Sequence, residues 1–494
     1  MLPPTRRALL SASVAAALCN APASLAVRLD PDGVGQALIF PYYTVQSAGP
    51  NPLNTYVSIV NHATDTKALR VRFRDGRNGA ETLSINLFLS PNDVWTGAVV
   101  PAGASASAGA TLLTADTSCT DPPFGVAGHS LDFRNAAYSG ANDDGAGTGL
   151  DRTREGFLEV LEMATLTGAS AQAVAHTPSG TVGNCAAVQG NASPALSLPT
   201  GGISGTFTLI NVANGMDFSA NADALADLGT HPYFRVATDP YPDLNAVEID
   251  TVSAVVLNGN VYRSTWVRPV DAVSAVLMRS QWMGEYVLDT ATASQTDVVV
   301  TFPTKRFYVT SSAMAAPFSG NPGWAKDCGS PVIPTSGEVI QYTTFNREEA
   351  GETHDVTAFP EQPPGAVDTL CGIANVFSVV EGGSGNLVTG PTAVLGSANR
   401  GLSSGDAHSQ EGAQDGWIQF VPTRTQRFLS GSTSTRLNVL GGTTQAGAQT
   451  FAGLPVVGFT VRTFQNGTLS CGGISCQGNY GSAFALKYRR SIGP

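Results

Sequence analysis

The chain has 494 residues, of which 42% are hydrophobic, enough to bury a substantial core and to exclude a chain that is disordered throughout. Only 13% are charged and 54 are glycine, a composition typical of a folded, turn-rich protein. The formal net charge of −11 argues against nucleic-acid binding and against electrostatic attraction to anionic lipid, since both need a basic face.

Residues 1–26 have the pattern of an export signal. Arg6 and Arg7 precede the apolar run Ala8–Leu18, and small residues follow it up to Ala26. This run is too short to cross a bilayer, which takes about 20 apolar residues, and no later stretch is apolar enough to do so. The arginine pair also fits a twin-arginine signal. We therefore expect an exported chain that is periplasmic, at the cell surface or extracellular, with no transmembrane span once the signal is removed.

Six cysteines remain when the signal is removed: Cys119, Cys185, Cys328, Cys371, Cys471 and Cys476. An even number in an exported chain predicts disulfides. Six cysteines allow many connectivities, and proximity along the chain favours Cys119–Cys185, Cys328–Cys371 and Cys471–Cys476. A zinc site is not indicated, because no Cys-x-x-Cys pair occurs and no histidine lies at ligand spacing beside these cysteines.

Alternating hydrophobicity predicts β-strands from the first part of the chain onward. The run Thr55–Val60 is β-branched and aromatic, and Ala68–Arg74 alternates apolar residues with arginines, which places the two kinds of side chain on opposite faces. Thr82–Leu89 alternates in the same way, and turn dipeptides separate these last two runs. Strands and turns that alternate at this spacing are typical of β-sandwiches.

Strand patterns continue to the C-terminus. Further strands are predicted at 156–163, 206–212, 247–257, 261–267, 275–279, 285–288, 297–302, 307–310, 339–345, 376–380, 416–421, 456–464 and 484–488. A short helix is predicted at Asp217–Leu228. The fold class that follows is all-β, with two or three antiparallel β-sandwich-like domains, long loops and few short helices.

Composition suggests domain boundaries near residues 200 and 310. The predicted units are the signal at 1–26, a β-sandwich-like domain at 27–200 with a long loop at 119–154, a β-rich domain at 201–310, and a β-rich domain at 311–494 with a long loop at 396–415. Long loops on a rigid sheet are frequent positions for function, although many are only solvated connections.

Three short patterns could carry chemistry. The segment 401–405 matches the Gly-x-Ser-x-Gly elbow around Ser403, but its Gly- and Ser-rich flanks lack the strand–helix pattern of such an elbow. Asp143, Asp144 and Asp151 could supply oxygen ligands to calcium, with a solvated Asx turn as the alternative, because the spacing is not that of an EF-hand. No other cofactor is indicated. A third group could hold a metal or move a proton, although its polar loop fixes no geometry: it comprises His408, Asp406, Glu411 and Asp415.

Carboxylates and aromatic residues suggest two further kinds of site. Glycoside hydrolysis needs two carboxylates about 5–10 Å apart. The glutamates on or near strands are Glu155, Glu159, Glu162, Glu248 and Glu285, and without such pairing they would lie on the outward faces of amphipathic strands. Exposed aromatic rings could stack on sugars, although core packing is the default. The aromatic candidates are Trp95, Trp266, Trp282, Trp324, Trp417 and the cluster at 40–43.

Three pairs of segments carry a resemblance to known proteins: 37–43 with 56–61, 71–74 with 87–95, and 285–289 with 301–305. Together they resemble a set of exported all-β proteins of Gram-negative bacteria. The resemblance covers roughly half of the chain and implies export and β architecture. It implies no activity, cofactor or catalytic residue.

The sequence therefore predicts an exported, non-catalytic β protein of the periplasm or cell surface with a structural, adhesive or ligand-binding role. The expected partner is a glycan or another surface protein, not a nucleic acid. The alternative is a secreted hydrolase of polysaccharide that uses a carboxylate pair.

Overall fold

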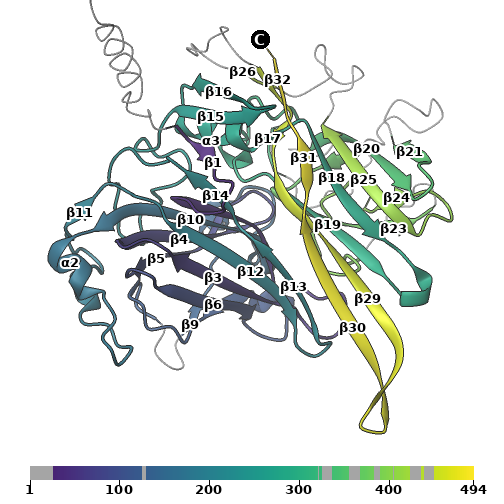
Figure 1. Cartoon of the computed structure of the whole chain (residues 1–494), viewed down its shortest axis with the longest axis horizontal. Helices are drawn as coiled ribbons and strands as arrows, with labels where there is room; N and C mark the ends of the chain where they lie inside the picture. The colour runs from purple at the N-terminus through teal and green to yellow at the C-terminus, as the bar shows by residue number, and fades with distance from the viewer. Residues whose placement is uncertain are drawn as a thin grey trace, which may run out of the picture.

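The computed structural model describes residues 26–124, 130–320, 322–324, 337–354, 368–382, 390–403, 405–422, 436–438 and 450–493. The predicted export signal lies outside these residues except for Ala26. Figure 1 shows two β-rich lobes, with the N-terminal part of the chain in purple to teal and the C-terminal part in green to yellow. The all-β prediction is confirmed.

The N-terminal lobe is a sandwich of two sheets. The first sheet has the order β1-β14-β2-β10-β4-β5-β8, with β11 paired to β10. Its strands are β1 Arg28–Leu29, β2 Ala37–Thr44, β4 Thr66–Asp75, β5 Glu81–Leu89, β8 Thr120–Asp121, β10 Glu155–Leu166, β11 Leu196–Ser197 and β14 Asp223–Ala226. The second sheet has the order β13-β12-β3-β6-β7-β9. Its strands are β3 Asn54–Asn61, β6 Val94–Pro101, β7 Ala110–Leu113, β9 Ser130–Asp132, β12 Ile203–Asn211 and β13 Met216–Asn221.

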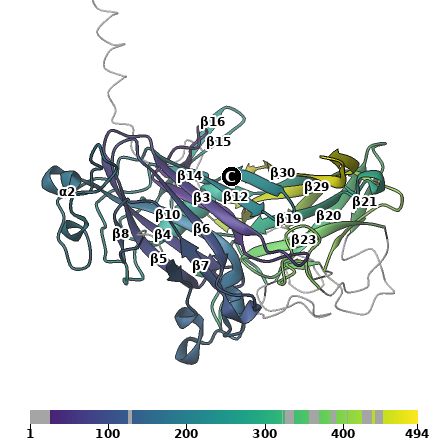
Figure 2. The same cartoon turned by 90° about the horizontal axis from the view of Figure 1, so that it is seen from below.

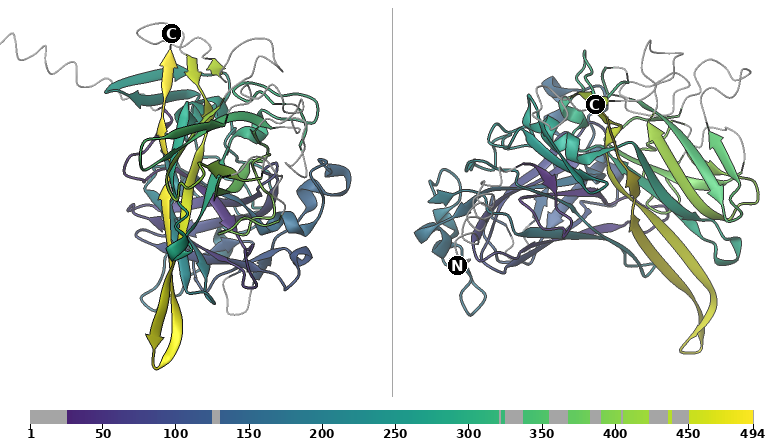
Figure 3. Two further views of the ribbon diagram at one scale, coloured as in Figure 1. Left: turned by 90° about the vertical axis from the view of Figure 1, so that its right-hand side faces the viewer. Right: turned by 45° about the horizontal axis from the view of Figure 1, so that its top comes forward.

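The C-terminal lobe contains two larger sheets as well (Figure 2). One has the order β21-β20-β25-β18-β31 with β22 paired to β20, and the other has the order β24-β23-β19-β29-β30. Their strands are β18 Gln281–Val287, β19 Gln295–Thr301, β20 Glu338–Asn346, β21 Gly351–His354, β22 Thr369–Leu370, β23 Ala374–Glu381, β24 Ala407–Ser409, β25 Asp415–Pro422, β29 Val457–Cys471, β30 Ile474–Ala485 and β31 Lys487–Arg489. The hairpin of β29 and β30 extends well beyond its sheet (Figure 3).

Smaller elements connect and border the sandwiches. The short strands are β15 Val252–Leu257, β16 Asn260–Thr265, β17 Met278–Arg279, β26 Arg436–Asn438, β27 Thr450–Ala452, β28 Leu454–Pro455 and β32 Ser491–Gly493. The described residues contain the α-helices α2 Gly168–Ala173 and α3 Pro269–Leu277. The 3-10 turns are η1 Ala106–Ala108, η2 Ala136–Tyr138, η3 Gly140–Asn142, η4 Leu150–Arg154, η5 Cys185–Ala187, η6 Thr290–Thr292 and η7 Lys305–Phe307.

The two sandwiches pack against each other through a sheet that is buried on both faces. Val298 and Val300 of β19 point into the core of the C-terminal sandwich, whereas Val299 joins the core of the N-terminal sandwich. The hydroxyl of Thr301 also donates to the carbonyl of Pro41 at 2.6 Å. Val376, Phe459 and Val461 of the neighbouring strands join the same core as Val299. Complete burial of one such valine contributes about 1.5–3 kcal/mol, so several contacts of this kind join the two sandwiches.

Residues 229–250 form an irregular segment that covers the arginine face of β4; we call it the cover segment. Arg70 donates to the carbonyls of Val236 at 2.7 Å and Asp239 at 2.8 Å, and Arg72 donates to the carbonyl of Pro242 at 2.6 Å. The predicted alternation of β4 is therefore confirmed, but its arginines are buried beneath backbone carbonyls. A guanidinium suits this position because it offers five N–H donors.

Three secondary-structure predictions are wrong. The predicted helix Asp217–Leu228 is instead strands β13 and β14, because neighbouring strands β12 and β2 offer paired backbone partners on two different sheets. The predicted strand at 275–279 lies mostly in α3, where Pro269 occupies the first turn and Asp271 accepts from Arg268 N–H at 3.3 Å. The predicted strand at 307–310 begins in η7 and makes only a single bridge at Val309.

The predicted domain boundaries do not separate the two sandwiches. β12 and β13 follow residue 200, but they complete the sheet that contains β3. β18 and β19 precede residue 310, but they pair with β25 and β29 of the C-terminal sandwich. Local composition could not reveal this, because both divisions are set by pairing between strands that are far apart in sequence.

Lys305 is a fully buried cation whose titration should be visible in the stability of the fold. Its Nζ donates to the carbonyls of Cys371 at 3.0 Å and Gly372 at 3.3 Å. Desolvation lowers the pKa of Lys305 from 10.5 to about 8, opposed by the charge of Glu338. Above pH 8 the unfolded chain therefore binds more protons at this residue than the folded chain, so the free energy of unfolding rises with pH.

We expect this contribution to amount to about 1–2 kcal/mol between pH 8 and pH 9.5, measured by urea unfolding. Lys305→Met should remove that rise, whereas Lys487→Met should retain it, because the side chain of Lys487 is 80% exposed. Equal slopes in the wild type and Lys305→Met would contradict the interpretation.

Candidate functional site

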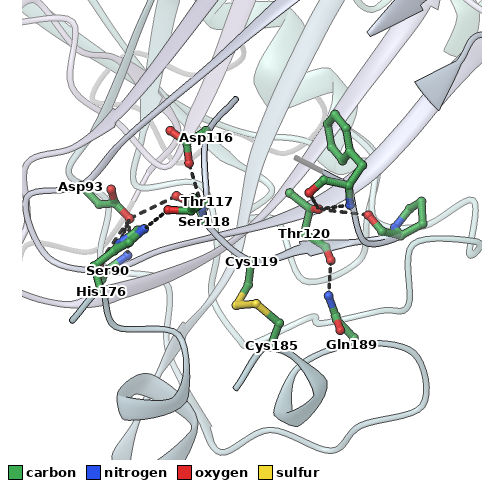
Figure 4. The surroundings of a disulfide bond; sticks show 12 residues. Ser90, Asp93, Asp116, Thr117, Ser118, Cys119, Thr120, His176, Cys185 and Gln189 are labelled. Atoms are coloured by element: carbon green, nitrogen blue, oxygen red, sulfur yellow. Dashed lines mark hydrogen bonds and ion pairs between the residues drawn. A yellow bond between two sulfur atoms is a disulfide. The ribbon is translucent and has the colours of Figure 1, made fainter. Parts of the chain in front are cut away.

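The predicted disulfide Cys119–Cys185 is confirmed, with a separation of 66 residues along the chain. Figure 4 shows that it joins the chain next to β8 to the turn η5. The side-chain amide of Gln189 donates to the carbonyl of Thr120 at 2.6 Å, so a hydrogen bond reinforces the same junction. The disulfide therefore fixes the segment around α2 to the first sheet.

The other predicted pairs include residues whose side chains are not described. Cys371 and Cys476 are each disulfide-bonded. Cys328 and the side chain of Cys471 lie outside the described part of the chain. The pairs Cys328–Cys371 and Cys471–Cys476 therefore stay predictions.

The predicted calcium ligands lie in the loop before β10, where two of them bind arginines. Asp144 accepts from both terminal nitrogens of Arg152 at 2.9 Å, and Asp151 accepts from Arg77 at 3.0 Å. Asp143 is exposed and accepts from the backbone N–H two residues further on, as in an Asx turn. Within the described ranges, no three His, Cys, Asp or Glu side chains are grouped to hold a metal. The calcium hypothesis gains no support from this arrangement.

Ser403 is buried, and its hydroxyl is hydrogen-bonded to the backbone. Its Oγ accepts from the N–H of Thr369 at 2.9 Å, at the start of β22. Gly401 passes close to the backbone of Asn375 on β23, so the first glycine of the matched pattern is needed for close packing. These contacts give Gly401 and Ser403 structural roles in the packing of β22 and β23.

The acidic residues that the sequence groups with His408 form no metal-binding cluster with it among the described residues. Glu411 is exposed. The ion-pair partners of the other two carboxylates are Arg400 for Asp406 and Arg347 for Asp415. The ring of His408 lies instead beside the ring of His354, with 6.4 Å between their centroids. Sequence could not indicate this neighbour, since 53 residues separate the two histidines.

The glutamates of β10 are buried, which corrects the expectation that they lie on an outward face. The carboxylate of Glu159 forms an ion pair with Arg74, 2.6 Å from its Nε. The carboxylate of Glu162 forms an ion pair with Lys67, 3.1 Å from its Nζ. Both cations are on β4, the strand next to β10, so each pair forms across the sheet. Two other predicted glutamates also form ion pairs, Glu248 with Arg235 and Glu285 with Arg462.

Glu155, at the start of β10, connects the two sandwiches. Its carboxylate accepts from Ser397 Oγ at 2.6 Å, Tyr42 Oη at 2.7 Å and Asn399 N–H at 3.3 Å. Burial raises the pKa of Glu155, and these hydrogen bonds act in the opposite direction. Because Ser397 and Asn399 lie in the loop predicted at 396–415, that loop serves at this point as a contact between sandwiches.

Most aromatic candidates from the sequence pack in the cores, as expected by default. Trp95 and Trp282 are completely buried and Trp266 is 5% exposed. Phe40, Tyr42 and Tyr43 are also buried, with at most 1% of each residue exposed. Trp417 stacks on Phe345, with 4.2 Å between ring centroids. Trp417 and Trp324 are half-buried, and the ring centre of Trp324 lies 5.9 Å from Nζ of Lys305. The three tryptophans of the cores therefore offer no open ring face to a sugar.

One aromatic side chain that the sequence reasoning did not single out is exposed on a sheet. Tyr56 of β3 is 47% exposed, while its neighbours Thr55 and Val57 are buried. It stands between Ala98 of β6 and Thr208 of β12 in the register of the sheet. The alternation of the strand could have identified it, because Val57 and Ile59 are apolar and Tyr56 has the opposite phase.

The side chains around Tyr56 form a surface that we call the outer face. Its residues are the outward-pointing ones of β3, β6, β12 and β13: Asn54, Tyr56, Ser58, Val60, Val94, Thr96, Ala98, Val100, Ser204, Thr206, Thr208, Ile210, Asp217, Ser219 and Asn221. Thr208 and Ser219 share a hydrogen bond of 2.8 Å between their hydroxyls. One register row places Thr96, Ser58 and Thr206 side by side.

The outer face carries almost no charge. Asp217, on the edge strand β13, is its single residue that is charged at neutral pH. Neighbouring strands lie about 4.8 Å apart, so the hydroxyl groups form regular rows beside the Tyr56 ring. An exposed ring with hydroxyl donors and acceptors around it can stack on an apolar ligand face and hydrogen-bond to the ligand's rim. The face therefore suits a neutral, polar ligand.

Among the residues with described positions, no helix is both long and apolar enough to cross a membrane. Comparisons with known protein families, with curated proteins and with solved structures find no match to this chain.

Proposed function

We propose that this chain is an exported, non-catalytic binding protein that holds a neutral glycan on its outer face. The observation that carries the proposal is the exposed Tyr56 ring within an uncharged, hydroxyl-rich surface on a braced double sandwich. A glycan has the matching chemistry, because its C–H faces stack on aromatic rings and its hydroxyls both donate and accept hydrogen bonds. Cationic or anionic ligands would find no row of opposite charges there.

Three features support the export part of this proposal. The sequence of residues 1–26 fits a signal, and the resemblance to exported all-β proteins points to the same compartment. The Cys119–Cys185 disulfide is of the kind that persists in oxidising environments. A ligand in such a compartment would be met outside the cytoplasm, where glycans are abundant surface components.

The hydrolase alternative receives less support from the glutamates of β10. Glu155 already accepts hydrogen bonds from Tyr42 and Ser397, one from each sandwich. Glu159 and Glu162 are each neutralised by a separate cation. These carboxylates therefore have structural partners in place of a shared substrate.

A glycan array tests the proposed function. The purified mature chain should bind one or more neutral glycans, and this binding should persist at 1 M NaCl, where a Debye length of about 3 Å screens charge–charge attraction. A parallel assay for new reducing ends should show no release from the bound glycans. Binding restricted to charged glycans and abolished by salt would contradict the proposal, and reducing-end release would favour the hydrolase.

A further inference from the structure

His354 and His408 form a pair of half-buried imidazoles that the proposed glycan site does not use. His354 ends β21 and its ring stacks on Tyr342 of β20, with 4.5 Å between centroids and an interplanar angle of 17°. His408 is on β24, in the facing sheet of the C-terminal sandwich. The two rings are thus brought together by elements of both sheets.

A hydrogen bond to the backbone orients the ring of His408, whose Nδ1 lies 3.1 Å from the carbonyl of Gly382. The ring nitrogen of His408 that faces this carbonyl must carry the proton, which leaves its other nitrogen, Nε2, with a lone pair. This second-sphere arrangement is the one that metal-binding histidines commonly have.

The Nε2 atoms of both histidines are buried and have no hydrogen-bond partner among the residues that the structure describes. A buried polar atom without a partner costs about 1–3 kcal/mol, so two in neighbouring rings call for an explanation. Neutral imidazole nitrogens are good ligands for Zn²⁺, Cu²⁺ and Ni²⁺. A single ion between the rings would satisfy both lone pairs at once.

We propose that His354 and His408 bind one divalent transition-metal ion through their Nε2 atoms, with water in the remaining coordination positions. No third His, Cys, Asp or Glu joins them within the described ranges, so the site is a two-ligand one with exchangeable positions. The Irving–Williams order then predicts tighter binding of Cu²⁺ than of Zn²⁺. This inference does not depend on the glycan proposal.

Isothermal titration of the mature chain with Zn²⁺, and separately with Cu²⁺, tests this site. The wild type should bind one equivalent of each, and His408→Gln should weaken that binding at least about tenfold, since even second-sphere changes cost 10- to 100-fold. His354→Phe should have the same effect while keeping an aromatic ring on Tyr342. His231→Gln should change nothing, because His231 is exposed and far from the pair in sequence.

A second measurement covers the case in which a variant folds poorly. In the wild type, Zn²⁺ should shift the ring ¹⁵N resonances of two histidines, with the larger shift at Nε2. Equal affinity in the wild type and both variants, or shifts at histidines other than these two, would overturn the proposal. An absence of binding by the wild type would overturn it as well, and would leave a buried water molecule as the partner of the two nitrogens.

Discussion

Arg152→Ala should lower the free energy of unfolding by about 3–5 kcal/mol, the usual cost of removing one partner from a buried ion pair. Arg152 is completely buried and lies 3.1 Å from Asp75, itself fully buried, and 2.9 Å from Asp144. Its guanidinium also lies 3.8 Å from the ring centre of Tyr138. Removal of this cation would leave the carboxylate of Asp75 without an ionic partner in the interior.

The effect should extend to the loop before β10. Arg152 donates to the carbonyl of Gly147 at 2.6 Å, so it also orders the segment that carries the predicted calcium ligands. Hydrogen exchange should therefore increase in residues 134–154 of the variant. Arg347→Ala is the matched control, since Arg347 forms an exposed pair with Asp415 and should cost less than about 1 kcal/mol. A similar small loss for Arg152→Ala would show that the network contributes little.

The double substitution Cys119→Ala with Cys185→Ala should lower stability by about 4 kcal/mol in urea unfolding. The disulfide closes a loop of 66 residues, and the loss of loop-closure entropy in the unfolded chain gives a value of this size. The substitution also removes the link between β8 and the segment around α2. Replacing both cysteines avoids a free thiol that could exchange with other disulfides.

The other contacts at this junction provide the comparison for the disulfide. Gln189→Ala removes the hydrogen bond to Thr120 and leaves the disulfide in place, and it should cost about 1 kcal/mol. If Gln189→Ala and the double cysteine variant lost the same free energy of unfolding, the role assigned to the disulfide would be contradicted. Thermal unfolding followed in both variants should place the first transition in the N-terminal sandwich.

Much of the strand content could be predicted because one face of each strand enters a core. The alternation at 68–74 and 82–89 corresponds to β4 and β5, and Leu69, Val71 and Phe73 are completely buried as their phase requires. The strands predicted at 247–257 and 261–267 correspond to β15 and β16, which pair with each other. In these segments the local pattern and the tertiary environment agree, so sequence alone was sufficient.

The errors arose where distant segments decide the outcome. The β-branched residues of α3 resemble a strand, but Val270, Val273 and Val276 occur at helical spacing and are buried together. The polar residues of β4 and β10 suggested solvent, but the cover segment buries the arginines. The sequence of residues 229–250 does not predict that this segment covers the arginines of β4, because its contacts with them use backbone carbonyls that any residue provides.

The candidate site was only partly accessible to sequence reasoning. The aromatic hypothesis concerned the kind of side chain on which the proposal rests, but it singled out the tryptophans, of which Trp95, Trp266 and Trp282 lie in cores. Tyr56 could have been found from its phase within Thr55–Val60, whereas its neighbours across the sheet depend on the register of β6 and β12. The absence of charge from the outer face becomes visible only when those strands are placed together.

The most direct test of the central claim compares Tyr56→Ala with Tyr480→Ala in binding the strongest neutral glycan. Tyr480 is 53% exposed, close to the 47% of Tyr56, but it lies on β30, outside the outer face. We predict that Tyr56→Ala weakens binding at least about tenfold, equivalent to about 1.4 kcal/mol, while Tyr480→Ala binds as the wild type does. Unchanged binding in Tyr56→Ala, with both variants folded, would contradict the claim that the outer face holds the ligand.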